Sequence, residues 1–145
     1  MFESFEEQEG APRDIARFEQ LWILAIGASA VIALGMYDYS AMIVGHIRAM
    51  LVNVVLFAIG WVLMGFVSRR RSGIARWLLI PFALLIFFYD LAHVTVMLET
   101  GWVAYVALAR IGLMAGAIYF LFAPRSRAWF AGRPLPPDGA NEDRS

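Results

Sequence analysis

Residues 49–68 read AMLVNVVLFAIGWVLMGFVS, an uncharged and mostly apolar stretch that lies between Arg48 and Arg69. A helix needs about 20 mostly apolar residues to cross the hydrocarbon core of a bilayer. Soluble domains rarely contain so long an uncharged stretch, and the whole chain is 61% hydrophobic with 17% charged residues. The stretch therefore predicts a transmembrane helix, and the chain is expected to be an integral membrane protein.

Three further apolar segments extend this prediction along the chain. Together the four segments predict membrane-spanning helices at about residues 18–37, 47–68, 76–98 and 102–123. Pro81 is expected in or just after the first turn of the third helix, where it removes few hydrogen bonds. Because the connections are short, neighbouring helices should run antiparallel. The predicted fold is an all-α membrane protein, a four-transmembrane-helix antiparallel up-down bundle.

The ends of the chain differ in composition from the spans. Residues 1–11 form an acidic tail and residues 132–145 a polar, proline-rich tail, and both are expected to be disordered, leaving a single membrane domain at 12–131. Residues 124–131 combine arginines with aromatic side chains and predict a short interfacial helix.

Tryptophans and a short apolar repeat mark the predicted membrane boundaries. Ile15, Phe18 and Trp22 recur at helical spacing before the first span, which predicts a short interfacial turn there. Trp22 lies near a predicted span end, as do Trp77, Trp102 and Trp129. We expect these tryptophans to anchor in the headgroup region.

The arginines predict which side of the membrane each connection occupies. One side would hold Arg48, and the other side would hold Arg13, Arg17, Arg69, Arg70, Arg71, Arg76, Arg125, Arg127, Arg133 and Arg144. Connections rich in arginine stay on the cytoplasmic side. A multi-pass protein of the inner membrane with both termini in the cytoplasm is therefore predicted.

The loop between the second and third spans concentrates this positive charge. It carries Arg69, Arg70, Arg71 and Arg76 next to the bilayer, and each arginine near an acidic leaflet gains about 1 kcal/mol of attraction. These residues are predicted ligands of lipid headgroups, so the bilayer itself is the first predicted partner. The chain has 12 basic and 12 acidic residues and no net charge, so nucleic acid is not an expected partner.

Two end segments resemble those of a group of small, uncharacterised bacterial four-helix inner-membrane proteins. They are Pro12-Arg13, Arg17-Phe18-Glu19 and Leu21 at the start, then Leu121-Phe122-Ala123-Pro124 and Arg127-Ala128-Trp129-Phe130 at the end. The resemblance spans the whole chain in layout and implies a bacterial inner-membrane protein with four helices. Because that group has no assigned activity, the resemblance implies no functional residue.

Catalytic and metal-binding patterns are missing from the sequence. The chain has no cysteine, which excludes disulfides, thiolate metal sites and thiol nucleophiles. We also find no nucleophile motif, phosphate loop or metal-ligand spacing, so we predict neither an enzyme nor a metal site. His46 and His93 suggest one alternative, because two facing imidazoles can hold a haem. Since His46 lies at or outside the start of its span, beside Arg48, no cofactor is predicted.

Asp90 and Arg110 lie at equal distances in sequence from Thr100, in the turn between the third and fourth spans. At 1.5 Å per residue each charge would lie about 12 Å below the outer helix ends, near the midplane of a ~30 Å core. An unpaired charge there costs roughly 3 kcal/mol, so the two should face inward and pair. His93, on the same face as Asp90, and Asn53 are expected to join them in one buried polar network.

Two interpretations of this network remain open. The network could fix the arrangement of the helices, as buried pairs do in some proteins. It could instead relay protons through Asp90 and His93 or hold an anionic group on Arg110, because ionisable residues inside a membrane are candidates for function. The first interpretation predicts a structural, accessory or partner-binding membrane subunit, and we favour it because no second acidic residue lies deep in the bilayer. The second predicts a small oligomeric transporter or proton-coupled carrier.

Small residues on two spans predict close helix packing. The fourth span carries Gly112 and Gly116, and the first repeats the same spacing with Ala25, Ser29 and Ala33. The glycines project about 120–200° away from Arg110 around their helix. We therefore expect the charged and smooth faces of the fourth helix to meet different neighbours. The smooth face is expected against the first helix, with self-association or another membrane protein as the alternative.

Overall fold

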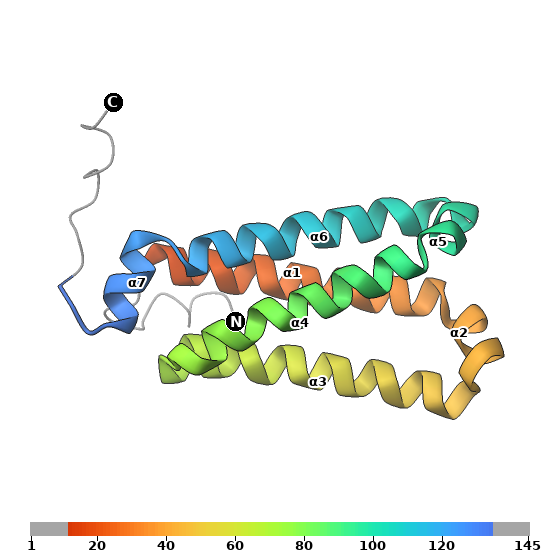
Figure 1. Ribbon diagram of the computed structural model, residues 1–145, viewed down its shortest axis with the longest axis horizontal. Helices are drawn as coiled ribbons and strands as arrows, with labels where there is room; N and C mark the ends of the chain where they lie inside the picture. Colours follow the sequence, from red (N-terminus) through yellow and green to blue (C-terminus); the bar gives the residue numbers. More distant parts are fainter. Residues whose placement is uncertain (1–11, 135–145) are drawn as a thin grey trace.

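The computed structural model describes residues 12–134, which form helices and no strand (Figure 1). Four long helices make up its body: α1 (Arg13–Gly35), α3 (His46–Arg70), α4 (Gly73–Ala92) and α6 (Trp102–Leu121). Each of them is long and apolar enough to cross a membrane. The predicted all-α membrane bundle is thereby confirmed. Of the disorder predicted at 1–11 and 132–145, residues 1–11 and 135–145 lie outside the described residues. The prediction is wrong at the start of the second tail, where the N–H groups of Gly132 and Arg133 donate to the carbonyls of Trp129 and Ala128 at 3.2 and 2.9 Å.

Three short helices lie at the two ends of the bundle. The far end holds α2 (Tyr37–Val44) and α5 (Val94–Thr100), and the opposite end holds α7 (Pro124–Phe130), the start of α1 and the α3–α4 turn (Figure 1). We call this opposite end the arginine end, because the Arg-rich loop and the arginines of α7 gather there. The helix predicted at 124–131 is present as α7.

The turn between α3 and α4 is tight, and hydrogen bonds cap the end of α3 and the start of α4. Arg71 ends α3 in the left-handed conformation (φ 50°), and the Ser72 N–H donates to the carbonyl of Phe66 at 3.2 Å. The hydroxyl of Ser72 then accepts from the N–H of Ala75 at 3.2 Å, which caps α4. At the far end, Gly45 (φ 85°) and Gly101 (φ 71°) supply the positive φ angles that reverse the chain.

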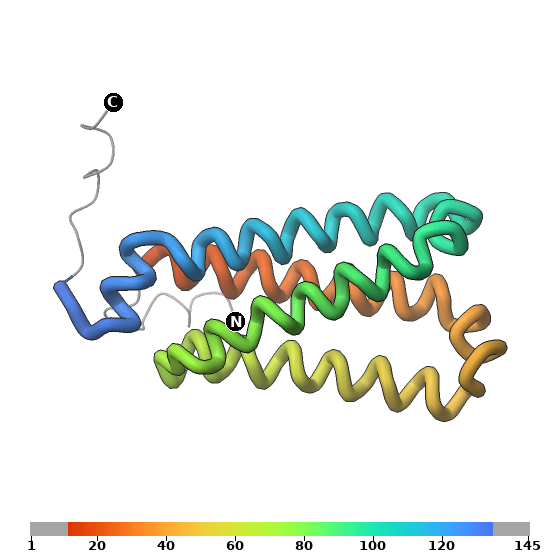
Figure 2. Tube along the Cα trace, viewed as in Figure 1, coloured from red at the N-terminus to blue at the C-terminus, as the bar shows by residue number. Residues whose placement is uncertain are grey.

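The third predicted span, residues 76–98, consists of two helices. The helix α4 already begins at Gly73 and encloses Pro81, so the expectation that Pro81 lies near the first turn is wrong. The chain leaves the helical path at His93 (φ −109°, ψ 13°) before α5 begins. Figure 2 shows the tube changing direction between α4 and α5. The Nδ1 atom of His93 lies 2.8 Å from the carbonyl oxygen of Tyr89. Because a carbonyl only accepts, Nδ1 carries a proton in this bond.

The first helix enters the bundle core earlier than predicted. Ile15, Phe18 and Trp22 are buried on one face of the continuous helix α1, in a cluster with Leu79 of α4 and Leu121 of α6. The predicted interfacial turn before the first span is therefore wrong. The same residues pack against the bundle because their spacing continues the inward face of α1.

The buried apolar side chains form two clusters rather than one core. The cluster at the arginine end includes Ala25 and Met114, and the far-end cluster includes Ile32 and Ala107. The helix α6 packs most extensively against α1. Ser29 of α1 and Arg110 of α6 lie between the two clusters, on the inward faces of these helices. Both belong to the candidate site described below.

The tryptophans divide into buried and exposed ones. Trp22 is fully buried and Trp129 is buried against the arginine end, whereas Trp77 and Trp102 are exposed. The headgroup-anchor interpretation is therefore wrong for Trp22 and Trp129. The indole of Trp22 instead donates from Nε1 to the carbonyl oxygen of Gly60 on α3, at 3.1 Å. This hydrogen bond ties α1 to α3.

Candidate functional site

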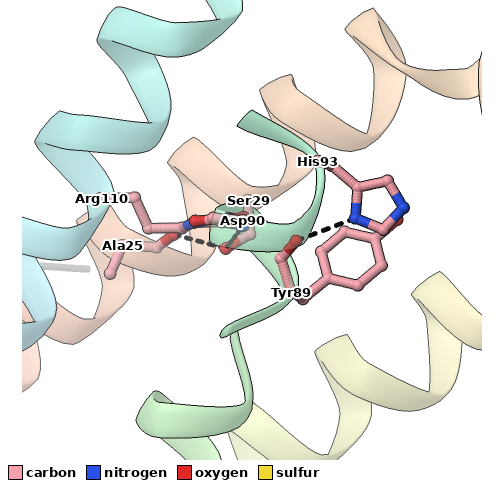
Figure 3. Close-up of polar contacts among 6 residues, drawn as sticks. All are labelled: Ala25, Ser29, Tyr89, Asp90, His93 and Arg110. Carbon is pink, nitrogen blue, oxygen red and sulfur yellow. Dashed lines mark hydrogen bonds and ion pairs between the residues drawn. The ribbon is translucent and has the colours of Figure 1, made fainter. Parts of the chain in front are cut away.

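Asp90 and Arg110 form an ion pair inside the bundle (Figure 3). Asp90 lies in the last turn of α4 and Arg110 lies midway along α6. The Nη2 atom of Arg110 donates to Oδ1 of Asp90, and each residue is 5% exposed. The chain reverses at Gly101, which places the two charges at the same level although they are far apart in sequence.

Ser29 of α1 is the third member of the site. Its hydroxyl accepts from Nη1 of Arg110 at 3.1 Å and donates to the carbonyl oxygen of Ala25 at 3.0 Å. These bonds connect α1, α4 and α6 at the level that separates the two apolar clusters. The sequence placed Ser29 on the small-residue face, and its role as a hydrogen-bond partner was missed.

The ion pair leaves one atom of each charged group without a partner. Oδ2 of Asp90 and Nε of Arg110 are buried and make no hydrogen bond in the described part of the chain. A two-pronged contact would have used more of both groups. Arg110 therefore keeps a free donor in the interior of the bundle.

The two other predicted members of the network lie outside it. The imidazole of His93 contacts the Tyr89 carbonyl and stacks on the Tyr89 ring at 4.3 Å between centroids, away from the ion pair (Figure 3). His93 is the C-cap residue of α4, and its side chain turns back to the Tyr89 carbonyl instead of contacting Asp90. Asn53 donates from Nδ2 to the carbonyl of Ala49 in its own helix, at 2.9 Å. The predicted four-residue network is therefore wrong in these two members.

The small-residue faces meet as expected, with one correction. A Cβ atom built on Gly116 would lie 3.3 Å from Leu21 of α1, whereas one on Gly112 would meet nothing within 4 Å. Gly116 thus faces α1, whose Ala25 is fully buried. The arginine side chain of α6 also reaches α1 through Ser29, so the expectation of separate neighbours for the charged and smooth faces is wrong.

Among the described glycines, the tightest contact lies elsewhere, near the far end of the bundle. A Cβ atom on Gly35 would lie 2.5 Å from the ring of Trp102. Gly35 was not among the residues predicted to pack closely. Ala33 is partly buried and lines a cavity described below.

The arginine end brings guanidinium groups and aromatic rings together. The guanidinium carbon of Arg76 lies 4.8 Å from the ring centroid of Phe122 and 4.9 Å from that of Phe130. Its Nε and Nη1 are buried without a hydrogen bond in the described residues. Arg71 lies 4.6 Å from the Trp129 ring, so cation–π contacts hold α7 on the bundle. Arg76 is partly buried, whereas the other predicted headgroup ligands are exposed: Arg69, Arg70 and Arg71. Headgroup binding by these four arginines stays a prediction.

Each histidine has a tyrosine as its neighbour. His46 Nδ1 lies 3.3 Å from the hydroxyl of Tyr37, with ring centroids 5.7 Å apart, while His93 stacks on Tyr89. Both imidazoles would have to leave these contacts to share a haem. Within residues 12–134 no three histidine or acidic side chains gather in a group that could hold a metal ion.

A cavity of about 390 Å³ lies beside the ion pair, bounded by α1, α2, α3, α4 and α6. Its wall on α3 extends from Ala49 to Gly60 and its wall on α4 from Phe82 to Tyr89. These two helices diverge toward the far end of the bundle (Figure 1). Most of its wall is aliphatic or aromatic. The polar residues of the wall are Ser29, Ser40, Asn53, Tyr89 and Arg110. Asn53 and Arg110 are thus neighbours of one cavity, although they are not hydrogen-bonded to each other.

Comparison with known proteins adds no family assignment. No protein-family model, curated protein or solved structure matches this chain. The site therefore has to be interpreted from its own geometry.

Proposed function

We propose that the protein is a non-enzymatic accessory subunit of a bacterial inner membrane that binds a helix of another membrane protein through α3. The observation that carries this proposal is the position of Trp61. It lies nine residues before Arg70, the last residue of α3, which is about 14 Å along the helix axis and near the bilayer midplane. Its side chain is 47% exposed on the outside of the bundle.

A tryptophan at this depth has no favourable partner in lipid. The indole of Trp61 makes no hydrogen bond within the described residues, and acyl chains offer no acceptor for its N–H group. Tryptophans normally lie at the membrane interfaces instead. At protein interfaces tryptophan is enriched among the residues that dominate binding. A partner helix would give the exposed ring both contact area and an acceptor.

Small residues on α3 favour such a helix contact. Ala58 is exposed, and a Cβ atom built on Gly65 would meet nothing within 4 Å. Small side chains allow the backbone of a second helix to approach closely. Only a few residues of α3 are buried, namely Ala49, Gly60, Val67 and Ser68. The helix therefore offers most of its surface to a neighbour.

The contacts of the ion pair fit a structural role better than a carrier role. A proton relay would need a second titratable group beside Asp90, and His93 is engaged with Tyr89. Asp90 is also absent from the wall of the cavity, which Arg110 reaches. Both charges lie on helices of the same chain. We therefore propose that the ion pair fixes the arrangement of these helices.

Photo-crosslinking in native membranes tests the partner helix. A photoreactive amino acid at Ala58 should give a discrete protein adduct, because that position lies beside Trp61 on the exposed face. The matched control is Leu108 of α6, which is 69% exposed and lies two residues from Arg110. It should give lipid adducts alone. Trp61→Ala should remove the adduct at Ala58, and identical lipid labelling at both positions would contradict the proposal.

We also propose that both termini lie in the cytoplasm. The arginine asymmetry supports this orientation, because the Arg-rich loop and α7 share one end of the bundle (Figure 1). A cytoplasmic reporter fused after Ser145 should be active, and a periplasmic reporter at the same position should be inactive. A fusion in the α2 segment should give the reverse pattern. Periplasmic activity at Ser145 would overturn the orientation.

A further inference from the structure

The cavity beside Arg110 has the size of a small-molecule site. Its volume of about 390 Å³ lies within the range of about 300–1,000 Å³ that is common for ligand pockets. Val52 of α3 and Leu85 of α4 line it and are both exposed. Because α3 and α4 diverge here, an occupant would enter sideways from the hydrocarbon core of the bilayer.

Two hydrogen-bond donors are available at the wall of this cavity. Arg110 is 5% exposed, and its Nη1 and Nη2 each hold one hydrogen bond, to Ser29 and Asp90, which leaves a second N–H on each nitrogen. Asn53 uses one bond of its amide nitrogen on Ala49, which leaves its second N–H free. A free donor in an apolar wall favours an occupant that brings an acceptor oxygen.

The charges near the cavity select against an ionised occupant. The positive charge of Arg110 is already compensated by Asp90, so an anionic head would compete with a buried carboxylate for the same guanidinium. A cationic head would face the same guanidinium charge without a free carboxylate in the described wall. The remaining wall is apolar and includes the rings of Phe57 and Phe82. A neutral, largely hydrocarbon molecule fits these conditions.

We propose that this cavity binds a neutral lipophilic molecule from the bilayer, whose head presents a carbonyl oxygen to Arg110 and Asn53. The aliphatic chain lies between α3 and α4 and leaves the cavity beside Val52 and Leu85. This site is separate from the exposed face around Trp61. Its test is therefore independent of the partner helix proposed above.

Competition labelling of the full-length protein in lipid nanodiscs tests the site. The probe is a monoacylglycerol with a diazirine in its acyl chain, and peptide mapping locates its adducts. Unlabelled monooleoylglycerol, oleate and octadecene are added as competitors at equal mole fractions. Labelling of cavity residues should be displaced about tenfold better by the neutral ester than by oleate or by octadecene, because a buried hydrogen bond to a charged donor is worth about this factor.

Two variants that fill the cavity, together with one control variant, show whether the probe labels the cavity or the outer surface. Ala33→Leu places extra volume in the cavity without touching the ion pair, and Val52→Phe does the same from α3 if the first variant folds poorly. Both should reduce cavity labelling at least about tenfold. Ala58→Leu adds the same volume on the outside of α3 and should leave the labelling unchanged.

Each other outcome overturns the proposal. Equal competition by all three molecules would indicate an apolar cavity that recognises no head, and tighter competition by oleate would indicate an anion site. Labelling that persists in both filling variants would place the probe on the outer surface of the bundle. The absence of any adduct on cavity residues would exclude binding there.

Discussion

Asp90→Asn is expected to reduce the unfolding free energy of the bundle by about 3–5 kcal/mol, the cost of breaking a buried ion pair. The substitution leaves Arg110 charged in the interior, where Ser29 and a neutral amide oxygen can accept from it but no carboxylate balances its charge. An arginine keeps its charge at any working pH. Steric trapping in bilayers or a denaturing-detergent titration measures the loss.

The reverse substitution, Arg110→Gln, should also cost about 3–5 kcal/mol, because it leaves the Asp90 carboxylate in the interior without its cationic partner. The double variant Asp90→Asn/Arg110→Gln should regain most of the stability that Asp90→Asn loses, because no charge is then left without a partner. Additive losses in the double variant would show that the two groups do not stabilise each other.

Two single variants serve as controls for this cycle. Asp38→Asn changes an exposed carboxylate at the far end and should alter stability by less than about 0.5 kcal/mol. Ser29→Ala removes one neutral partner of Arg110 and should cost about 1–2 kcal/mol. If Asp38→Asn were as damaging as Asp90→Asn, the loss would reflect charge in general and not the pair.

The ion pair could be predicted because two arguments indicate the same contact: the energetic cost of an unpaired charge in the membrane, and the spacing of Asp90 and Arg110 in the sequence. A charge near the midplane needs a partner, and the equal distances of Asp90 and Arg110 from Thr100 allow one arrangement in an antiparallel hairpin. The third member was not predictable in this way. Ser29 reaches Arg110 only when α1 has a particular rotation against α6, and a single sequence does not fix the rotation between helices that are distant in the chain.

The errors at His93 and Asn53 have a different cause. The expectation for His93 assumed that one helix runs from residue 76 to 98, whereas the backbone leaves the helical path at this residue. No glycine or proline marks the break, so composition gives no signal for it. Asn53 lies at the right depth, but α3 diverges from α4 and a cavity replaces direct contact. Such a gap depends on side-chain volumes across several helices.

The burial of Trp22 could have been predicted from the spacing of the residues on the inward face of the first helix. Its distance from the span end suggested an anchor, yet Ile15, Phe18, Trp22, Ala25, Ser29 and Ile32 follow one inward face at alternating spacings of three and four. That continuous face predicts burial for all of them. In the structure the Trp22 ring lies 5.9 Å from Phe18 and 6.2 Å from Phe82, measured between centroids.

Trp22→Ala is therefore expected to destabilise the bundle far more than Trp77→Ala, which removes an exposed ring. A bilayer supplies no hydrophobic driving force between helices, so the loss comes from the cavity left behind and from the hydrogen bond to Gly60. The cavity alone should cost about 3 kcal/mol. Trp22→Phe keeps most of the volume and should cost about 1 kcal/mol for the lost hydrogen bond. Unfolding titrations of the three variants in the same bilayer measure these differences. Equal losses at Trp22 and Trp77 would restore the interpretation of Trp22 as a headgroup anchor, because a buried ring and an exposed one cannot leave equal cavities.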